Sequence, residues 1–160
     1  MIMQIRRMTQ DDIEAVDAIQ RRAYGPELVE PIDVLASRVQ VAPEFCFVAH
    51  RDAQVLGYVL AHPWTHDSSP GLGAVLDGLP EACNVVHLHD MAVDPQFGGS
   101  GVGRALLEAL EKAVWDAGVE QLTLVAVQGA SSFWEKMGFR ARRAASGYGE
   151  DAVFMVRDKR

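Results

Sequence analysis

The sequence predicts a single domain of the mixed α/β class, and three observations support this prediction. The chain has 160 residues, of which 49% are hydrophobic and 23% charged, a size and composition that suit one soluble core. Apolar residues recur with a period of two in some segments and with helical spacing in others. Between residues 84 and 127 a strand, a glycine-rich turn, a helix and an apolar strand follow one another. No repeat or linker divides the chain, so residues 1–160 are expected to form one domain.

The first third of the chain predicts one strand and two helices. Residues 5–8 read as a short strand, and Thr9 is placed to cap a helix with Asp12 three residues later, as in a capping box. Gly25 and the proline after it end this helix, and Pro31 suits the first turn of the next one. The residues expected to face the core are Ile13, Val16, Ile19 and Ala23 in the first helix and Ile32, Leu35, Ala36 and Val39 in the second.

A hairpin and a long loop follow. Residues 45–50 and 55–62 flank a short polar connection and predict a β-hairpin. Residues 64–82 contain three glycines and two prolines and show little periodicity, which indicates a long loop. Loops of this length are often lids or binding loops, and a tolerated surface insertion is the alternative.

The second half predicts the remaining elements. Residues 84–93 form a strand, residues 104–117 a helix that Gly118 ends, and residues 121–127 an apolar strand covered on both faces. The inner side of that helix carries Leu106, Leu107, Leu110, Ala113 and Val114. The chain then continues with a short helix at 131–137, a strand from Phe139, a glycine-rich turn at 146–150 and a last strand at 152–156.

The glycine-rich turn at residues 98–103 predicts an anion site. Four glycines in six residues let the backbone approach a ligand closely, and the free N–H groups and dipole of the following helix favour negative charge. A tight turn without a ligand is the alternative. A P-loop is excluded because Arg104 and Ala105 stand where its lysine and hydroxyl residue belong, and a dinucleotide-binding loop needs glycine at position 104.

The motif resembles the pyrophosphate loop of the GNAT superfamily of N-acetyltransferases, written Arg/Gln-x-x-Gly-x-Gly/Ala. Gly101 and Gly103 occupy the two glycine positions, whereas Gly98 replaces the Arg or Gln. Residues 91–95 resemble the central strand and its exit in this family, and residues 133–139, Phe-Trp-Glu-Lys-Met-Gly-Phe, resemble its late signature. The resemblance implies a GNAT-like fold, with a mixed, mostly antiparallel sheet of about six to seven strands flanked by about four helices.

The same resemblance implies acetyl-CoA as cosubstrate, with no metal. The diphosphate is expected on the backbone amides of the turn, and the pantetheine arm along the central strand. The residues expected to bind the coenzyme are Met91, Ala92, Val93, Gly98, Gly99, Ser100, Gly101, Val102, Gly103, Arg104, Phe133 and Trp134.

The central strand carries two histidines, His87 and His89, and resembles the His-x-His strand of arylalkylamine N-acetyltransferases. The period of two places both rings on one face of the strand. An alkylamine must lose a proton before it attacks a thioester, and imidazole, with a pKa near 6.5, can accept that proton directly or through water. Both are therefore candidate catalytic residues, and the alternative is that each is a hydrogen-bonded core histidine.

Trp134 stands where the family usually has a tyrosine that acts as general acid. An indole N–H donates a hydrogen bond but supplies no proton. Three outcomes follow: the CoA thiolate leaves unassisted, or Ser131, Ser132 or Tyr148 donates or positions a water, or turnover is poor. In packing terms, Trp134 beside Phe133 is expected to form an aromatic plug.

Charge and remaining motifs limit the partners. The net charge of −7 disfavours nucleic acid and anionic membranes as partners. No secretory signal or membrane-length apolar run is expected, and Cys46 and Cys83 read as buried, reduced thiols in a cytoplasmic protein. His50, His62 and His66 have no metal-ligand spacing and are expected in surface or turn positions.

Two functions from different classes are therefore carried forward. The first is acetyl transfer to a small primary amine of arylalkylamine or polyamine type, and the second is an acyl-CoA-binding sensor that has lost turnover. A third function, that of a nucleotide-phosphate enzyme, needs a P-loop lysine that this sequence does not have. The sequence leaves a homodimer open.

Overall fold

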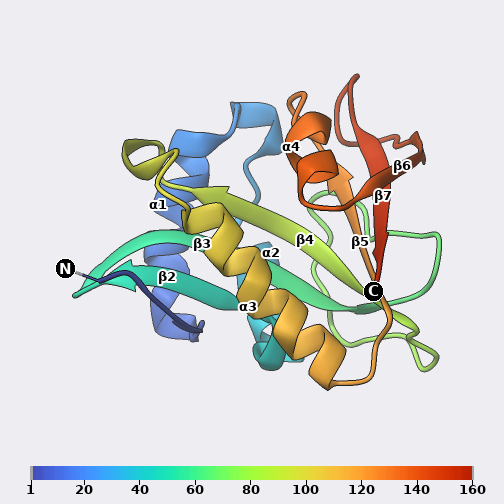
Figure 1. Cartoon of the computed structure of the whole chain (residues 1–160), viewed down its shortest axis with the longest axis horizontal. Coiled ribbons are helices and arrows are strands. Elements are labelled where there is room, and N and C mark those ends of the chain that lie inside the picture. The colour runs from blue at the N-terminus through green and yellow to red at the C-terminus, as the bar shows by residue number, and fades with distance from the viewer. Residues whose placement is uncertain (1, 160) are drawn as a thin grey trace.

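The protein is described by a computed structural model that covers residues 2–159. Its centre is a seven-stranded sheet in the order β1-β2-β3-β4-β5-β7-β6, with helices on both faces (Figure 1). All neighbouring strands are antiparallel except β4 and β5, which are parallel. The predicted fold class, strand number and mostly antiparallel sheet are thereby confirmed. The strands are β1 (Gln4–Arg7), β2 (Phe47–Arg51), β3 (Gln54–Trp64), β4 (Val85–Val93), β5 (Gln121–Ala126), β6 (Arg140–Ala144) and β7 (Val153–Asp158).

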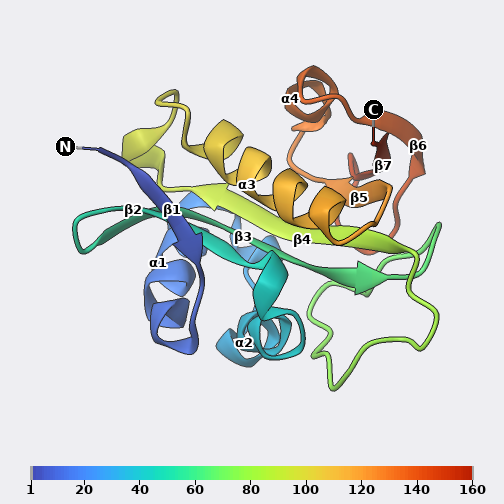
Figure 2. The same cartoon turned by 60° about the horizontal axis from the view of Figure 1, so that its bottom comes forward.

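Four α-helices cover the sheet, two on each side. Figure 2 shows one pair on one face and the other pair on the opposite face. The first pair is α1 (Ile13–Ala23) and α2 (Ile32–Val41), and the second pair is α3 (Val102–Asp116) and α4 (Ser131–Lys136). Within residues 2–159 no helix is long and apolar enough to cross a bilayer.

Each face of the sheet has its own apolar core, because the strands alternate their side chains between the two faces. On the α3 face, Leu106, Leu107 and Leu110 pack with β-strand residues such as Val59 and Leu88. On the α1–α2 face the buried cluster is Met8, Ile13, Val16, Ile19, Leu35, Val39, Cys46, Val48, Tyr58, Leu60 and Ala92. The predicted capping box is present, with Asp12 accepting from the Thr9 amide at 2.8 Å.

Some expectations from the sequence were wrong. Ile32 is 47% exposed instead of facing the core, because it is the first residue of α2 and the following turn buries Val34 instead. Helix α3 begins at Val102, two residues earlier than expected, since Gly101 at φ +84° already serves as its N-cap. Cys46 is buried as expected, but Cys83 is only half-buried in the loop before β4.

Candidate active site

The site forms where β4 and β5 separate. These two parallel strands pair over only three residues of each, Val86–Leu88 with Leu122–Leu124. Beyond that point β4 continues to Val93 beside β3 alone, so its edge toward β5 is open. A cavity of about 510 Å³ lies in this opening, with Met91, Ala92 and Val93 in its wall. The separation of the strands thus leaves backbone hydrogen-bonding groups accessible to a ligand.

The glycine turn closes one end of this cavity. Gly98, Gly99, Gly101, Val102, Gly103 and Arg104 line it, whereas Ser100 lies outside and donates its hydroxyl to the Phe97 carbonyl. Gly99 and Gly101 have φ of +78° and +84°, a region that favours glycine. The first amides of α3 have no acceptor within the helix. The turn therefore presents N–H donors at the positive end of a helix dipole.

Gly103 lies where α3 packs against β4, and a Cβ there would make ordinary van der Waals contacts. A Cβ placed on Gly103 would lie 3.5 Å from Met91 Cε and 3.7 Å from Val93 Cγ2. A side chain larger than that of alanine would therefore push into the strand that lines the cavity.

Aromatic side chains from α4 form the opposite wall near the turn. Phe133 and Trp134 meet edge to face at 5.1 Å between ring centroids, and Trp134 meets Phe139 in the same way at 5.4 Å. Both Phe133 and Trp134 line the cavity, so the expected aromatic plug is confirmed. Tyr148 also reaches the cavity, where its hydroxyl donates to the Pro70 carbonyl. Ser131 and Ser132 lie outside the cavity wall.

A β-bulge determines where the histidines of β4 lie. The β3–β4 register shifts so that Leu60 faces Asp90 and Ala61 faces Leu88, which leaves His89 without a partner on β3. Such an extra residue bends a strand and redirects side chains. His89 lines the cavity, whereas His87 lies behind it and is only 1% exposed. His62 lies near both, with ring centroids 5.7 Å from His87 and 6.3 Å from His89.

His87 and His62 are buried, neutral core histidines. His87 Nδ1 is 2.9 Å from Thr123 Oγ1, and burial, helped by the neighbouring His62, lowers the pKa of His87 well below its ordinary value. His62 donates from Nδ1 to the Pro63 carbonyl at 3.0 Å, and burial lowers its pKa to about 3. The expectation of a surface or turn position for His62 was therefore wrong. The alternation of Tyr58, Leu60 and His62 along one face of β3 is the signal that the sequence offered.

The other two histidines lie as expected. His50 Nδ1 is 3.0 Å from the Asp52 carbonyl in the hairpin turn, and His66 pairs with Asp67 in an exposed loop. Among residues 2–159 no group of three His, Cys, Asp or Glu side chains is arranged to hold a metal ion.

His89 is paired with a buried carboxylate, that of Glu30. Its Nε2 donates to Glu30 Oε1 at 2.6 Å, and both side chains are buried. Burial alone would favour the neutral acid, but the hydrogen bonds from His89 and from the Gly73 amide hold the pKa of Glu30 below its ordinary value. An ionised carboxylate only accepts hydrogen bonds, so in the neutral form of the ring the proton resides on Nε2. Within the described chain, buried His89 Nδ1 has no hydrogen-bond partner.

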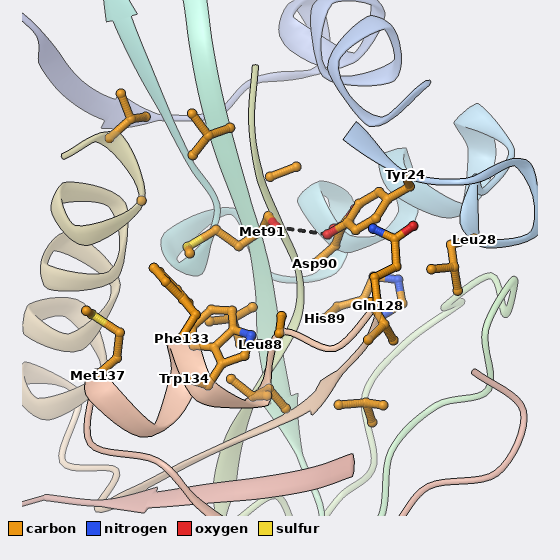
Figure 3. A pocket seen from close by; sticks show the side chains of 18 of the residues that line it. Tyr24, Leu28, Leu88, His89, Asp90, Met91, Gln128, Phe133, Trp134 and Met137 are labelled. Atoms are coloured by element: carbon orange, nitrogen blue, oxygen red, sulfur yellow. Dashed lines mark hydrogen bonds between the residues drawn. The ribbon is translucent and has the colours of Figure 1, made fainter. Parts of the chain in front are cut away.

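Asp90, the next residue, joins β4 to α1. Its two carboxylate oxygens accept from the Tyr24 and Tyr58 hydroxyls, each at 2.7 Å. The Tyr24 hydroxyl also lies 2.9 Å from the Met91 carbonyl, the contact drawn in Figure 3. Burial raises the pKa of Asp90 above its ordinary value, an effect that nearby His89 and the two hydroxyl donors only partly offset. The hydrogen bonds of Tyr24 and Asp90 hold the segment of β4 beside the cavity opening in place.

The comparisons with known proteins agree with this architecture. The model of the family described as "Acetyltransferase (GNAT) family" matches residues 13–139, more than half of the chain. An uncharacterised N-acetyltransferase of Methanocaldococcus jannaschii is 29% identical over 164 residues, which cover 98% of this chain and 92% of the relative.

Two solved structures show the same fold. Ard1 from Thermoplasma volcanium has a TM-score of 0.78 at 21% identity, covering 100% of this chain and 99% of that one. The PaiA N-acetyltransferase from Thermoplasma acidophilum, solved in complex with coenzyme A, has a TM-score of 0.75 at 15% identity, with 99% of each chain covered. With the family match over residues 13–139 and the open strand pair next to a glycine turn, this chain belongs to the GNAT family of acetyltransferases and is an acyltransferase.

Proposed function

We propose that the protein transfers acetyl from acetyl-CoA directly to the primary amine of a small molecule with an apolar body, such as an arylalkylamine. One observation carries the proposal. The cavity that the glycine turn lines is also lined by His89, whose Nε2 donates to Glu30 and whose Nδ1 has no hydrogen-bond partner among the described residues. A free imidazole nitrogen beside a coenzyme channel is what deprotonation of an amine requires.

The coenzyme fits the end of the cavity formed by the turn. Its diphosphate would lie on the first amides of α3, where a Cβ added at Gly99 or Gly101 meets no described atom within 4 Å. The pantetheine arm would follow the open edge of β4 along Met91–Val93. Backbone N–H groups of that edge would polarise the thioester carbonyl. That a structural neighbour was solved in complex with coenzyme A supports the choice of coenzyme.

The amine fits the other end of the cavity. There the wall is formed by Tyr24, Leu28, Leu72, Leu124 and Tyr148, with the Glu30 and Asp90 carboxyl groups among them. Apolar side chains would bind the body of the acceptor, and the buried Glu30 carboxylate favours an approaching ammonium group over an anion. Arg104, a cation in the cavity wall, belongs to the opposite end, in the first turn of α3.

The transfer itself needs a base near the acceptor nitrogen. The ammonium group of the substrate would give one proton to His89 Nδ1, directly or through water. The resulting amine attacks the thioester carbonyl carbon, the new C–N bond forms and the C–S bond breaks with its electron pair passing to sulfur. The amide nitrogen sheds its second proton as the thiolate becomes a thiol, so one proton is released to solvent overall. In this scheme His87 supports the strand instead of accepting the proton.

The departure of the CoA thiolate needs no tyrosine in this scheme. Trp134 supplies no proton, and the Tyr148 hydroxyl is committed to the Pro70 carbonyl. Burial also raises the pKa of Tyr148, which makes it a weaker acid. A thiol with a pKa near 8.5 gives a weakly basic thiolate, which is a good leaving group, so we propose that the thiolate departs unassisted and is protonated afterwards.

Thiol release with a panel of amines tests the proposal. Incubation with acetyl-CoA and arylalkylamines, polyamines or amino acids should release free CoA together with an equal amount of N-acetylated amine, measured by mass spectrometry. Tight binding of CoA without acetylation of any amine in the panel would instead support an acyl-CoA sensor. The replacement of the family's Arg or Gln by Gly98 and of its tyrosine by Trp134 keeps that second candidate in view.

A further inference from the structure

The loop that follows β3, residues 65–84, covers the acceptor end of the cavity and is held from two sides. We name it the acceptor-side loop. Figure 2 shows it on the same face of the sheet as α2, and Leu72 brings it into the cavity wall. On the side of the β6–β7 hairpin, Arg142 binds Asp67 at 2.8 Å and Tyr148 donates to the Pro70 carbonyl.

Three contacts hold the same loop on the α2 side, all within residues 73–76. The Gly73 amide donates to Glu30 Oε2 at 2.8 Å, and Arg38 donates to the Ala74 carbonyl. The Leu76 amide donates to Ser37 Oγ at 3.1 Å. The Gly73 contact is distinctive because its acceptor is a buried carboxylate that also binds the candidate base.

Glu30 is therefore shared between the loop and the histidine. Oε1 accepts from His89 Nε2 and Oε2 accepts from the Gly73 amide, so both oxygens are in use. The segment that carries Glu30 is itself held in place, since the Gln20 side chain donates to the Glu30 carbonyl at 2.7 Å and accepts from its amide at 3.0 Å. Because one carboxylate binds both groups, a displacement of the Gly73 amide changes the hydrogen bond to His89, and a displacement of His89 changes the hydrogen bond to Gly73.

We propose that Glu30 is a positioning residue that couples docking of the acceptor-side loop to the tautomer of His89. With the loop docked, Glu30 is fixed as an acceptor for Nε2–H, and Nδ1 is left as the nitrogen that takes a proton. When the loop lifts, the carboxylate loses one of its two partners and His89 loses its fixed orientation. The catalytic meaning of this coupling rests on the proposed acetyl transfer, whereas the coupling itself does not.

The charged and titratable groups around Glu30 come from several elements. His89 and Asp90 face it from β4, Arg38 from α2, Tyr24 from the end of α1, and Tyr148 from the β6–β7 connection. Arg38 is fully buried, and within the described residues its Nε and Nη2 have no hydrogen-bond partner. Its positive charge helps to lower the pKa of Glu30 and so favours the ionised form that the coupling requires.

Glu30→Gln tests the coupling while keeping the shape of the side chain. The two donors point at different oxygens of Glu30. In the amide one of these oxygens is replaced by an NH2 group, which donates, so either the Gly73 amide or His89 Nε2–H faces a donor instead of an acceptor. Glu27→Gln, an exposed carboxylate three residues earlier, is the matched control. His89→Gln approaches the coupling from the other side, and circular dichroism with thermal melting establishes that each variant is folded.

Two readouts do not depend on activity. Hydrogen–deuterium exchange of the peptide spanning residues 71–77 should become about tenfold faster in Glu30→Gln and faster in His89→Gln, because a charge-assisted hydrogen bond at the loop is lost or loosened. The ¹⁵N chemical shifts of the His89 ring should report a proton on Nε2 in the wild-type protein and a changed tautomer population in Glu30→Gln. Glu27→Gln should match the wild-type protein in both measurements.

Kinetics provide a third readout. If the wild-type protein acetylates an amine, Glu30→Gln should lower kcat by about 10²- to 10⁴-fold with an unchanged KM for acetyl-CoA. Wild-type exchange and an unchanged His89 tautomer in folded Glu30→Gln would overturn the coupling even in an active enzyme. An inactive wild-type protein whose exchange and tautomer respond as described would overturn the proposed function and leave the coupling in place.

Discussion

From the position of Gly101 in the glycine turn, we predict how Gly101→Glu changes stability and CoA binding. Gly101 has φ of +84°, and a Cβ there meets no described atom within 4 Å, so the first atom of the added side chain meets no steric obstacle in the free protein. The left-handed backbone costs an L-residue about 1–2 kcal/mol. In a domain of this size that corresponds to a loss of about 2–8 °C in Tm. The folded protein should therefore survive the substitution.

Coenzyme binding should suffer more than stability. A carboxylate about 6 Å from one diphosphate charge is repelled by about 3 kcal/mol at an effective dielectric constant of about 20. This corresponds to about 10²-fold weaker binding for a single pair of charges, and the second phosphate adds to it. Isothermal titration calorimetry with CoA measures the change directly.

Gly118→Glu provides the matched control. Gly118 stands just beyond the opposite end of the same helix, at φ +81°, and a Cβ there also meets no described atom within 4 Å. The two variants should lose similar stability, but only Gly101→Glu should lose affinity for CoA. Gly101→Ala separates backbone strain from charge. If Gly101→Glu bound CoA within about threefold of the wild-type protein, the assignment of the diphosphate to this turn would be refuted.

Three further predictions concern the side chains around the cavity. His89→Gln should lower kcat by about 10²-fold or more without changing CoA affinity, whereas His87→Gln should act mainly on Tm; equal losses of kcat in the two would contradict the distinction between them. Because the pKa of His62 is about 3 when folded and near 6.5 when unfolded, the unfolded chain binds a proton first as pH falls. The free energy of unfolding should therefore fall below about pH 6.5, by about 1.4 kcal/mol per pH unit for this histidine. Denaturant titrations between pH 7 and 5 measure this dependence, and the free energy of unfolding should change less steeply with pH in His62→Gln. Tyr148→Phe should keep kcat within a fewfold of the wild-type value, and a fall of about 10²-fold would identify Tyr148 as the acid that protonates the leaving thiolate.

Local chemistry explains which parts of the fold could be predicted from the sequence. The capping box at Thr9, the apolar periodicity of α3 and the glycines before it act within a few residues. The end of the cavity at the glycine turn followed from the same short-range motif, and the residues expected there line the cavity except Ser100. Ile32 was misplaced because helical periodicity does not show where the first turn leaves the core.

The acceptor end was less predictable because it depends on contacts between distant parts of the chain. The His89–Glu30 pair joins residues 59 positions apart, and the Tyr24–Asp90 pair joins residues 66 positions apart. The bulge opposite Leu60 and Ala61 also shifts the alternation of side chains along β4 at His89. The sequence of β4 contains no glycine or proline that would indicate a bulge. A strict period of two therefore gave His87 and His89 equal roles, whereas the structure places only His89 in the cavity wall.

The most direct test of the account is a crystal structure with CoA and an acetylated amine bound. The account predicts the diphosphate on the backbone amides of residues 99–104. It also predicts the acceptor nitrogen within hydrogen-bond reach of His89 Nδ1, or one water away from it. A coenzyme seated away from the glycine turn, or an acceptor nitrogen with no path to His89, would contradict it.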